Sequence, residues 1–488
     1  MKVLVINGSP KGDHSCTLQT SLYLQKKRKE HEFTFYNAGA MIRQAEKDFS
    51  EPKRLIREAD LLLFSYPVYT FAAPCQLHKF IALMKENLQP EDLQGEFATQ
   101  ITTSKHFYDV TAHNYIRENC QDMGLKFING LSADMDDLTL PRGRKEAVTF
   151  FDYADWCVRN DVYEAFPAPR PADNHVKVTP VKAAENPVPE SSPGAKTTAG
   201  EIQTAAGTET LPSGQSDGSA VETPRSIALV ADLAPEDTQL SDMIARFTAR
   251  IKGYEVRLIN IHNFPFKGGC ISCFNCASDG VCIYKDGFAE LLRGQIQTCS
   301  AIVLAFSIKD HSMGPVFKTY DDRQFCNGHR TVTMGKPFGY LISGNYSTEQ
   351  NLQMIINGRA EVGGNFLAGT ATDEFDPDAE IDALAKRLDY AIVHQYVQPS
   401  NFLGVGGMKI FRDLIWLMQG MMKADHRFYK KHGMYDFPQK KRGKMMAMYL
   451  VGALMSNPKL KKKAGGKIDE GMVAPYKKVL DNAENDGI

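Results

Sequence analysis

The sequence repeats its own pattern at a constant offset of 240 residues. At this offset the apolar run after Asp60 lies over the apolar run after Ser300, and the match continues without a gap to Gly124, which aligns with Gly364. Any two parallel-sheet proteins share apolar strands, but a register that persists through several loops is better explained by duplication. We therefore expect two related domains in one chain.

A stretch of low complexity separates the two repeats. Residues 168–224 contain no aromatic residue, Met or Cys, and are dominated by Pro, Ala, Gly, Ser, Thr and charged residues. Such a segment cannot bury enough apolar surface to offset the entropy lost on ordering, so we predict a disordered linker. This prediction divides the chain into a first domain, 1–167, a second domain, 225–399, and a C-terminal segment, 400–488.

Each repeat alternates short apolar runs with segments long enough for helices, which favours an α/β fold with a parallel sheet covered on both faces. Ligands of such sheets bind beyond the carboxyl ends of the strands, so the loops that follow strands are the first places to look for a site. The predicted strands of the first domain are 2–7, 33–36, 60–65, 97–103 and 126–128.

The segment 400–488 has a different character, with apolar residues at helical spacing from Met408 onward and a second apolar run after Lys444. We predict a helical extension. Packing on the second domain or a homodimer contact is favoured over a membrane-surface contact helped by the basic run 459–463, because basic clusters are most often solvated. Neither run is long enough for a transmembrane segment.

Composition narrows the class of protein. Lys and Arg number 57 against 58 Asp and Glu, so the usual electrostatic signal of nucleic-acid binding is missing. The first apolar run is too short for a signal peptide, and we expect a cytoplasmic protein. Ten Cys are too few for a disulfide scaffold, so clustered Cys would indicate metal or redox chemistry.

A polar loop follows the first predicted strand and precedes a helix expected near Leu18. Backbone N–H groups at a helix N-terminus attract phosphate, and Ser9, Ser15 and Thr17 add hydroxyl donors. The spacing fits a monophosphate, because the chain has no phosphate loop of the nucleotide-hydrolase type and no dinucleotide fingerprint after a strand. Taken alone, this loop could equally be a capped strand-to-helix turn.

Two further strand ends complete the same edge of the predicted sheet. The third strand runs into Pro67, Val68 and Tyr69, a rigid loop suited to lying against a flat heteroaromatic ring. The fourth runs into Thr103 and Ser104, whose hydroxyls suit the polar edge of such a ring. Three consecutive strand ends thus offer phosphate donors, a wall for a ring and polar partners.

This combination resembles the flavodoxin-like family of NAD(P)H-dependent FMN reductases and quinone reductases, over residues 1 to about 165. The resemblance implies two flavodoxin-like, doubly wound domains, FMN as cofactor and NAD(P)H as electron donor. His78 departs from it, because the family often has Lys there. No catalytic side chain is expected, because the flavin itself carries the electrons. The residues that the resemblance implies for FMN are Ser9, Pro10, Lys11, Ser15, Thr17, Pro67, Val68, Tyr69, Thr103 and Ser104.

The second domain departs from the pattern at both ligand loops. Asp232, Glu236 and Asp237 follow its first strand and would repel a phosphate, and residues 307–309 read Ser-Ile-Lys where the first domain has Pro-Val-Tyr. We expect this domain not to bind FMN in the standard way.

The second domain instead has a cysteine cluster, Cys270, Cys273, Cys276 and Cys282, with the spacing C-x2-C-x2-C-x5-C. Such spacing suits a [4Fe-4S] cluster, although four Cys can also hold zinc. It resembles that of iron-sulfur flavoproteins and equally that of cluster-free relatives among the FMN reductases, so cluster, zinc and metal-free thiols all stay open. We hypothesise that one half holds FMN and the other supplies a redox centre or a lid; a decayed duplicate kept for packing is the alternative.

The predicted function is a flavin-dependent oxidoreductase that passes electrons from NAD(P)H through FMN to a small acceptor, such as a quinone, a nitro compound or a flavin, or to a redox protein. One alternative is an electron carrier, of the flavodoxin or iron-sulfur flavoprotein type, without nicotinamide turnover of its own. Another is a flavin- or metal-binding scaffold without turnover.

Overall fold

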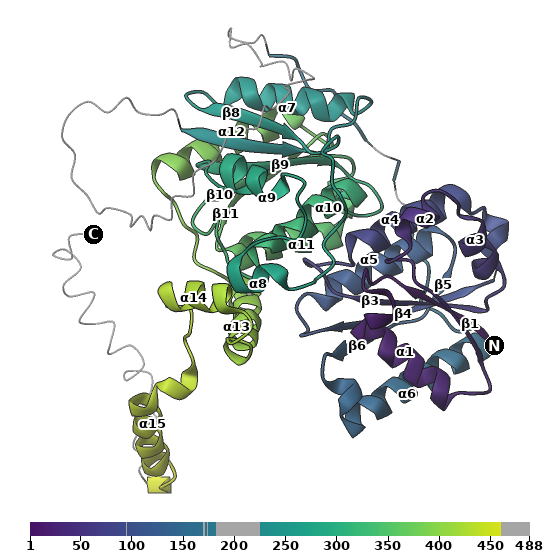
Figure 1. Ribbon diagram of the computed structural model, residues 1–488. Coiled ribbons are helices and arrows are strands. Elements are labelled where there is room, and N and C mark those ends of the chain that lie inside the picture. The colour runs from purple at the N-terminus through teal and green to yellow at the C-terminus, as the bar shows by residue number, and fades with distance from the viewer. Residues whose placement is uncertain (94, 169–170, 173, 182–224, 460–488) are drawn as a thin grey trace, which may run out of the picture. The chain divides into compact units, whose positions relative to one another are not determined.

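The computed structural model describes residues 1–93, 95–168, 171–172, 174–181 and 225–459 (Figure 1). The predicted linker lies outside the described residues from 182 to 224. The chain forms two compact units, 1–426 and 427–488, and the larger unit holds both predicted domains.

The first domain is built on a parallel sheet in the order β2-β1-β3-β4-β5, with β6 also pairing with β4. Its strands are β1 (Lys2–Asn7), β2 (Glu32–Tyr36), β3 (Leu61–Pro67), β4 (Phe97–Ser104), β5 (Lys126–Phe127) and β6 (Leu131–Asp134). The five predicted strands are confirmed; β6, a short strand of mixed burial, was not foreseen.

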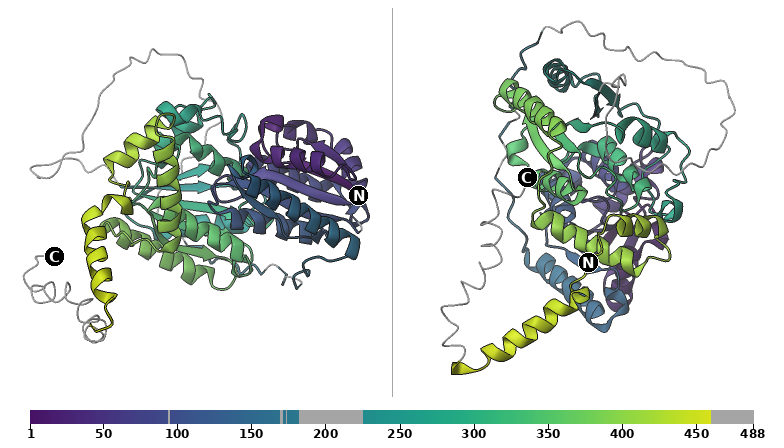
Figure 2. Two further views of the ribbon diagram at one scale, coloured as in Figure 1. Left: turned by 90° about the horizontal axis from the view of Figure 1, so that it is seen from below. Right: turned by 90° about the vertical axis from the view of Figure 1, so that its left-hand side faces the viewer.

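Helices cover both faces of this sheet (Figure 2). Alternate residues of β1 face opposite ways, so that Val3 and Val5 pack with α1 and α6, whereas Leu4 and Ile6 pack with the helices of the other face. This double burial explains the near-continuous apolar strands. The helices are α1 (Cys16–Lys27), α2 (Ile42–Ala45), α3 (Ser50–Arg57), α4 (Cys75–Asn87), α5 (Asp109–Asp122) and α6 (Pro141–Asn160).

The second domain repeats the same topology, with the parallel order β8-β7-β9-β10-β11. Its strands are β7 (Ser226–Ala231), β8 (Glu255–Asn260), β9 (Ala301–Ser307), β10 (Pro337–Ser343) and β11 (Phe366–Thr372). Its helices are α7 (Thr238–Arg250), α8 (Asn275–Asp279), α9 (Phe288–Leu291), α10 (Gly314–Arg323), α11 (Gln350–Gly363) and α12 (Pro377–Val393). Both domains are therefore flavodoxin-like, as predicted.

Loop residues that are 240 positions apart have similar backbone conformations. Thr70 and Phe71 have left-handed backbones with φ of 43° and 69°, and their counterparts Asp310 and His311 have φ of 53° and 63°. In both loops the residues that flank this pair form an antiparallel β-bridge, between Tyr69 and Ala72 in the first domain and between Lys309 and Ser312 in the second. Residues with side chains rarely adopt this conformation, so a shared pair of such residues supports the duplication.

The two domains pack through equivalent helices. Helix α4 contacts α10, and α5 contacts α11, each helix meeting its own counterpart (Figure 1). Phe71 and Ala72 of the first domain belong to the second domain's hydrophobic cluster, and Asn351 Nδ2 donates to the Thr111 carbonyl at 3.0 Å. The halves thus form a pseudo-symmetric pair inside one compact unit.

Part of the predicted linker contacts the second domain. Val178 is buried in that domain's core, the Val176 N–H donates to the Asp373 carbonyl, and His175 Nδ1 lies 2.8 Å from Asp373 Oδ2. The prediction of disorder from residue 168 onward is therefore corrected for residues 174–179. The Val, His and Asn side chains of this short run find partners that its overall composition did not indicate.

Helix α13 (Phe402–Leu417), the first part of the predicted extension, packs against α11 within the larger unit. Its Phe411 ring stacks on Phe107 of the first domain at 4.3 Å between centroids. Helix α14 (Lys423–Lys431) crosses the boundary of the two units. The helical extension is confirmed, and its packing is shown for α13.

In the smaller unit, α15 (Arg442–Met455) carries exposed apolar residues, among them Tyr449 and Leu450. The predicted homodimer contact remains a prediction, and the basic run 459–463 lies outside the described residues beyond Lys459. No helix in the described part of the chain is long and apolar enough to span a membrane.

Candidate functional site

The predicted flavin loops and the predicted cysteine cluster line one cavity of about 440 Å³. All the residues predicted for FMN line it except Pro10, and so do all four clustered Cys. The first domain contributes its strand-end loops, and the second contributes the loop between β8 and α9. Two segments some two hundred residues apart in sequence therefore face the same space.

The first loop has the geometry expected of a phosphate site. Ser15 is the N-cap of α1, where its hydroxyl accepts from the Leu18 N–H at 3.4 Å. Asn7 braces the loop, because its Nδ2 donates to the Gly12 carbonyl at 2.9 Å and its Oδ1 accepts from the Ser9 N–H at 3.2 Å. The N-terminus of α1, with its unpaired N–H groups and positive dipole end, is held facing the cavity.

Several hydroxyls at this site are buried without a partner among the described residues. They are Thr17 Oγ1 in the first loop, Thr70 Oγ1 after β3 and Thr103 Oγ1 at the end of β4, and all three residues line the cavity. A buried polar atom without a hydrogen bond is costly, so each is a candidate partner for a bound ligand. Their positions, at the phosphate loop, the ring loop and the ring edge, fit FMN.

Tyr69 joins the ring loop to the second domain. Its carbonyl accepts from Lys318 Nζ at 2.8 Å, and its ring meets Phe325 edge to face at 6.0 Å. Burial raises the pKa of the Tyr69 hydroxyl, and a hydrogen bond with Ser272 of the cysteine loop acts in the opposite direction. Tyr69 is thus a neutral aromatic wall of the cavity.

The cysteine loop has a strained backbone beside the flavin loops. Ser272 and Phe274 are left-handed, with φ of 50° and 59°, and the Lys11 ammonium lies 5.4 Å from the Phe274 ring centroid. Gly269 passes so close to Cys75 that an added Cβ would lie 2.1 Å from its sulfur. Only glycine allows this approach, which brings the cysteine loop against α4.

A buried ion pair holds the ends of this loop. The Arg323 guanidinium, 2% exposed at its side chain, binds both Asp286 oxygens at 2.8 Å and donates to the Gly268 carbonyl at 2.9 Å. It also lies 4.3 Å from the Tyr284 ring centroid. Burial would raise the pKa of Asp286, but the hydrogen bonds from Arg323 outweigh it and hold the pKa at about 2. Arg323 is a positioning residue for the cysteines.

Two of the four thiols, Cys270 and Cys276, are not activated by their surroundings. Burial raises the pKa of Cys270 to about 12 and that of Cys276 to about 11. Thiolates at these positions therefore need a metal centre to stabilise them. In a tetrahedral zinc site, with Zn–S of about 2.3 Å, ligand sulfurs lie within about 4 Å of one another; among the described residues no three cysteine sulfurs lie within 4.8 Å.

Sequence reasoning missed other cavity residues. Cys326 was interpreted as an ordinary thiol, yet it lines the cavity, and Cys276 Sγ donates at 3.1 Å to the carbonyl of the preceding residue, Phe325. Arg323 and Phe325 also line it from the end of α10. No spacing in the sequence connects these residues to the cysteine loop; the packing of the end of α10 against that loop within the second domain does.

The counterpart site of the second domain has a different chemistry. A cavity of about 410 Å³ lies at its strand ends, lined by Glu236, Asp237 and Ser307 among others. The Asp237 carboxylate accepts from the Ala234 N–H at 2.9 Å and from Ser307 Oγ at 3.2 Å, and the buried Asp232 pairs with His262. Carboxylates thus occupy the region that a phosphate would need.

Comparison with known proteins supports the fold described above. Residues 1–87 match the model of a family described as having a flavodoxin-like fold. The chain is 24% identical over 196 residues to an iron-sulfur flavoprotein of Archaeoglobus fulgidus, which covers 37% of this chain and 86% of that protein. The match over residues 1–87 supports the flavodoxin-like fold of the N-terminal domain, and the resemblance predicted from the sequence is confirmed.

Solved structures of similar fold include an NADH:FMN oxidoreductase in its apo form, at 18% identity and a TM-score of 0.29, covering 34% of this chain and 91% of that one. An FMN-dependent NADH-azoreductase of Bacillus anthracis in complex with FMN is 15% identical, with a TM-score of 0.25, covering 33% of this chain and 99% of that one.

Proposed function

We propose that this chain is a flavin-dependent oxidoreductase that holds one FMN in the first domain and a [4Fe-4S] cluster in the cysteine loop of the second. NAD(P)H is the proposed donor, and a small molecule or a redox protein is the acceptor. The observation that carries the proposal is the shared cavity, where the flavin loops and the four cysteines face one another.

FMN, when bound, exchanges electrons in pairs or singly, and an iron-sulfur cluster exchanges them singly. The chain's own residues bind and orient. Ser9, Ser15 and Thr17 with the α1 N-terminus bind the phosphate, residues 67–69 lie against the ring, and Thr103 meets its edge. The cavity wall is otherwise mostly apolar, with Leu292, Phe338, Phe411 and other residues that exclude water from the ring.

A cluster rather than zinc is favoured by the spacing of the cysteines, because three Cys at two-residue intervals is the arrangement that ferredoxin-type loops use for a [4Fe-4S] cluster. The apolar wall favours a flat, weakly polar acceptor, such as a quinone or a nitroaromatic compound. The acidic counterpart loops in the second domain support a single FMN per chain.

A second candidate function is an electron carrier without nicotinamide turnover. Cys273 is exposed, whereas the other three clustered Cys are half-buried. An exposed ligand offers electrons a short route from the cysteine loop to a docked redox protein, and this favours the carrier function.

Anaerobic mixing with NADH and with NADPH tests the choice. Bleaching of the flavin absorbance within seconds supports the reductase, whereas bleaching only by a reduced protein donor supports the carrier. A flavin that neither donor reduces would contradict both and leave a binding scaffold.

A further inference from the structure

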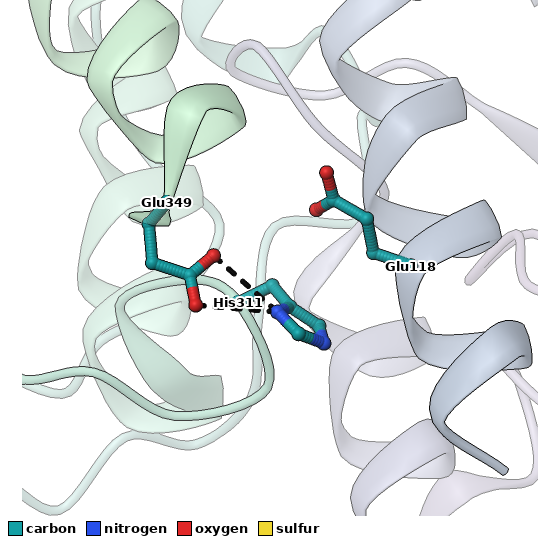
Figure 3. A group of neighbouring side chains, drawn as sticks. All are labelled: Glu118, His311 and Glu349. Carbon is teal, nitrogen blue, oxygen red and sulfur yellow. Dashed lines mark hydrogen bonds and ion pairs between the residues drawn. The ribbon is translucent and has the colours of Figure 1, made fainter. Parts of the chain in front are cut away.

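A cluster of metal-ligating side chains lies between the two domains, away from the flavin loops. Ligand atoms of Glu118, His311 and Glu349 all lie within 4.8 Å of one another (Figure 3). Glu118 comes from α5, His311 from the loop after β9, and Glu349 from the residue before α11. The two domains therefore contribute to one group of potential ligands.

Histidine is the centre of this cluster. His311 Nδ1 lies 3.3 Å from both carboxylate oxygens of Glu349, and its Nε2 lies 2.6 Å from Asp122 Oδ2. His311 and Glu349 are each 5% exposed. Glu349 is the N-cap of α11, but its side chain does not cap the helix and instead faces His311 (Figure 3).

The pseudo-symmetry of the chain provides an internal comparison. The interface between the two domains has two sides related by the 240-residue offset. If Glu118, Asp122, His311 and Glu349 only served to pack the domains together, we would expect similar side chains at the four offset positions on the other side. The other side does not carry them, because only one of the four counterparts at the 240-residue offset has a metal-ligating side chain. The counterparts of Glu118, Asp122, His311 and Glu349 are Gly358, Val362, Phe71 and Asp109.

Asp109, the one counterpart with a metal-ligating side chain, already has hydrogen-bond partners close by in the sequence. Asp109 Oδ2 lies 2.9 Å from His106 Nδ1, and Val110 N–H donates to its other oxygen. Phe71, in the place of His311, packs among aromatic rings, with Tyr108 at 4.5 Å between centroids. The three clustered ligands, together with Asp122 on His311 Nε2, thus lie on one side of the interface only.

The cluster is open to an ion from the second cavity. Asp122, His311 and Glu349 line the cavity of about 410 Å³ at the strand ends of the second domain, which also holds Glu236 and Asp237. These carboxylates give the cavity an excess of negative charge that attracts cations. A cation entering it meets His311 at its wall.

We propose that Glu118, His311 and Glu349 form a binding site for a divalent first-row transition metal ion, such as Mn²⁺ or Zn²⁺, that links the two domains, and that Asp122 is a positioning residue that holds Nε2 of the imidazole. Imidazole and carboxylate are the ligand types that such ions accept, and the absence of thiol ligands distinguishes this site from the cysteine loop. In the absence of the ion, His311 is the positive partner of the carboxylates; on binding, its imidazole releases a proton to solvent, ligates the ion in its neutral form, and the ion becomes that positive partner. Because the ion binds residues of both domains, it stabilises the folded chain by an amount that grows with the logarithm of the free ion concentration above the dissociation constant.

Mn²⁺ is the appropriate probe, because it prefers oxygen and imidazole ligands and competes poorly for thiolates. We would titrate Mn²⁺ into the full chain and count free ion by electron paramagnetic resonance. His311→Phe places at this position the residue that its counterpart has, in a backbone that Phe71 already adopts. Glu349→Gln and Glu118→Gln keep the side-chain shape and remove a charge.

The expected result is saturable binding of a single Mn²⁺, weakened about ten-fold or more by each of these variants. Asp109→Asn, the acid of the opposite side, and Cys276→Ser, in the cysteine loop, should leave binding unchanged. Thermal melts with and without Mn²⁺ check that the variants fold, and only the wild type and the controls should gain stability with the ion. Equal binding by wild type and His311→Phe, or no saturable binding, would overturn the proposal and leave His311 as the ion-pair partner of its neighbouring carboxylates.

Discussion

The carbonyl of Tyr69, in the ring loop of the first domain, accepts a hydrogen bond from Lys318 Nζ of the second domain at 2.8 Å. Lys318 is fully buried and pairs with Asp322, whose other oxygen accepts from the Cys75 N–H at 2.7 Å. One ion pair on α10 thus holds both the ring loop and the start of α4. The second domain therefore contributes to the proposed flavin site even though its own counterpart loops are altered.

Replacing this buried cation should destabilise the protein and loosen the ring loop. In Lys318→Met the carboxylate of Asp322 loses its partner in a buried position, and we expect unfolding free energy to fall by about 3–5 kcal/mol, with weaker FMN binding. Urea unfolding and FMN titration measure the two effects. The double variant Lys318→Met with Asp322→Leu should recover much of the stability, and a loss as large as in the single variant would contradict the assignment.

Thr17 should contribute to FMN affinity through its hydroxyl. Thr17→Val keeps the side-chain shape and removes the buried Oγ1 that lacks a partner among the described residues, so we expect FMN binding to weaken about ten-fold, with protein stability unchanged or higher. Thr20→Val is the matched control, because Thr20 is buried on the same helix and does not line the cavity. Quenching of FMN fluorescence gives both affinities, and equal values for the two variants would rule out this role.

Iron binding by the cysteine loop and FMN binding by the flavin loops should be separable by mutation. Cys276→Ser removes one proposed cluster ligand, and we expect most of the iron to be lost while bound FMN remains. Cys120→Ser, a buried thiol on α5 outside the cavity, should keep both. Iron and flavin analysis of the purified variants tests this, and full iron retention by Cys276→Ser would exclude Cys276 as a ligand.

Glu96 should make stability fall as the pH rises. Burial, reinforced by Asp60 and Asp92, raises the pKa of Glu96 to about 8, whereas the unfolded chain releases this proton near pH 4.3. Between these values the folded state holds more protons than the unfolded state, so stability is fully present below the lower pKa and is lost as pH rises through 8. Replacing Glu96 by an uncharged residue should therefore stabilise the folded state most at high pH.

Glu96→Gln measures this effect. Its stability gain over the wild type should grow from pH 5 to pH 8 by up to about 1.4 kcal/mol per pH unit. Glu91→Gln, an exposed acid nearby, is the control and should show no such growth. A gain for Glu96→Gln that does not depend on pH would refute the assignment.

The fold and the flavin loops were predictable because local signals determine them. The doubly buried strand β1, the Ser15 cap and the Pro67 loop are each encoded within a few residues. The offset of 240 residues, read from the sequence, persists in the backbone of Phe71 and His311. Periodicity and turn chemistry are short-range, so one sequence was enough for them.

The composition of the shared cavity was not predictable. Arg323 and Cys326 line it because the end of α10 packs against the cysteine loop, and α10 faces the flavin loops because it packs on α4; the sequence carries no sign of which helix faces meet. The ordered run around Val178 was missed for the same reason, since its partners lie two hundred residues away. Contacts between domains depend on shape complementarity over whole surfaces, which residue patterns do not reveal.

The most direct test of the central claim is the ultraviolet-visible spectrum of the protein purified without oxygen, with FMN and iron counted per chain. The account predicts flavin bands from one FMN per chain together with a broad iron-sulfur absorbance. Flavin without iron would contradict the role given to the cysteine loop, and two FMN per chain would contradict the altered loops of the second domain. A colourless protein that takes up no added FMN would contradict the site as a whole.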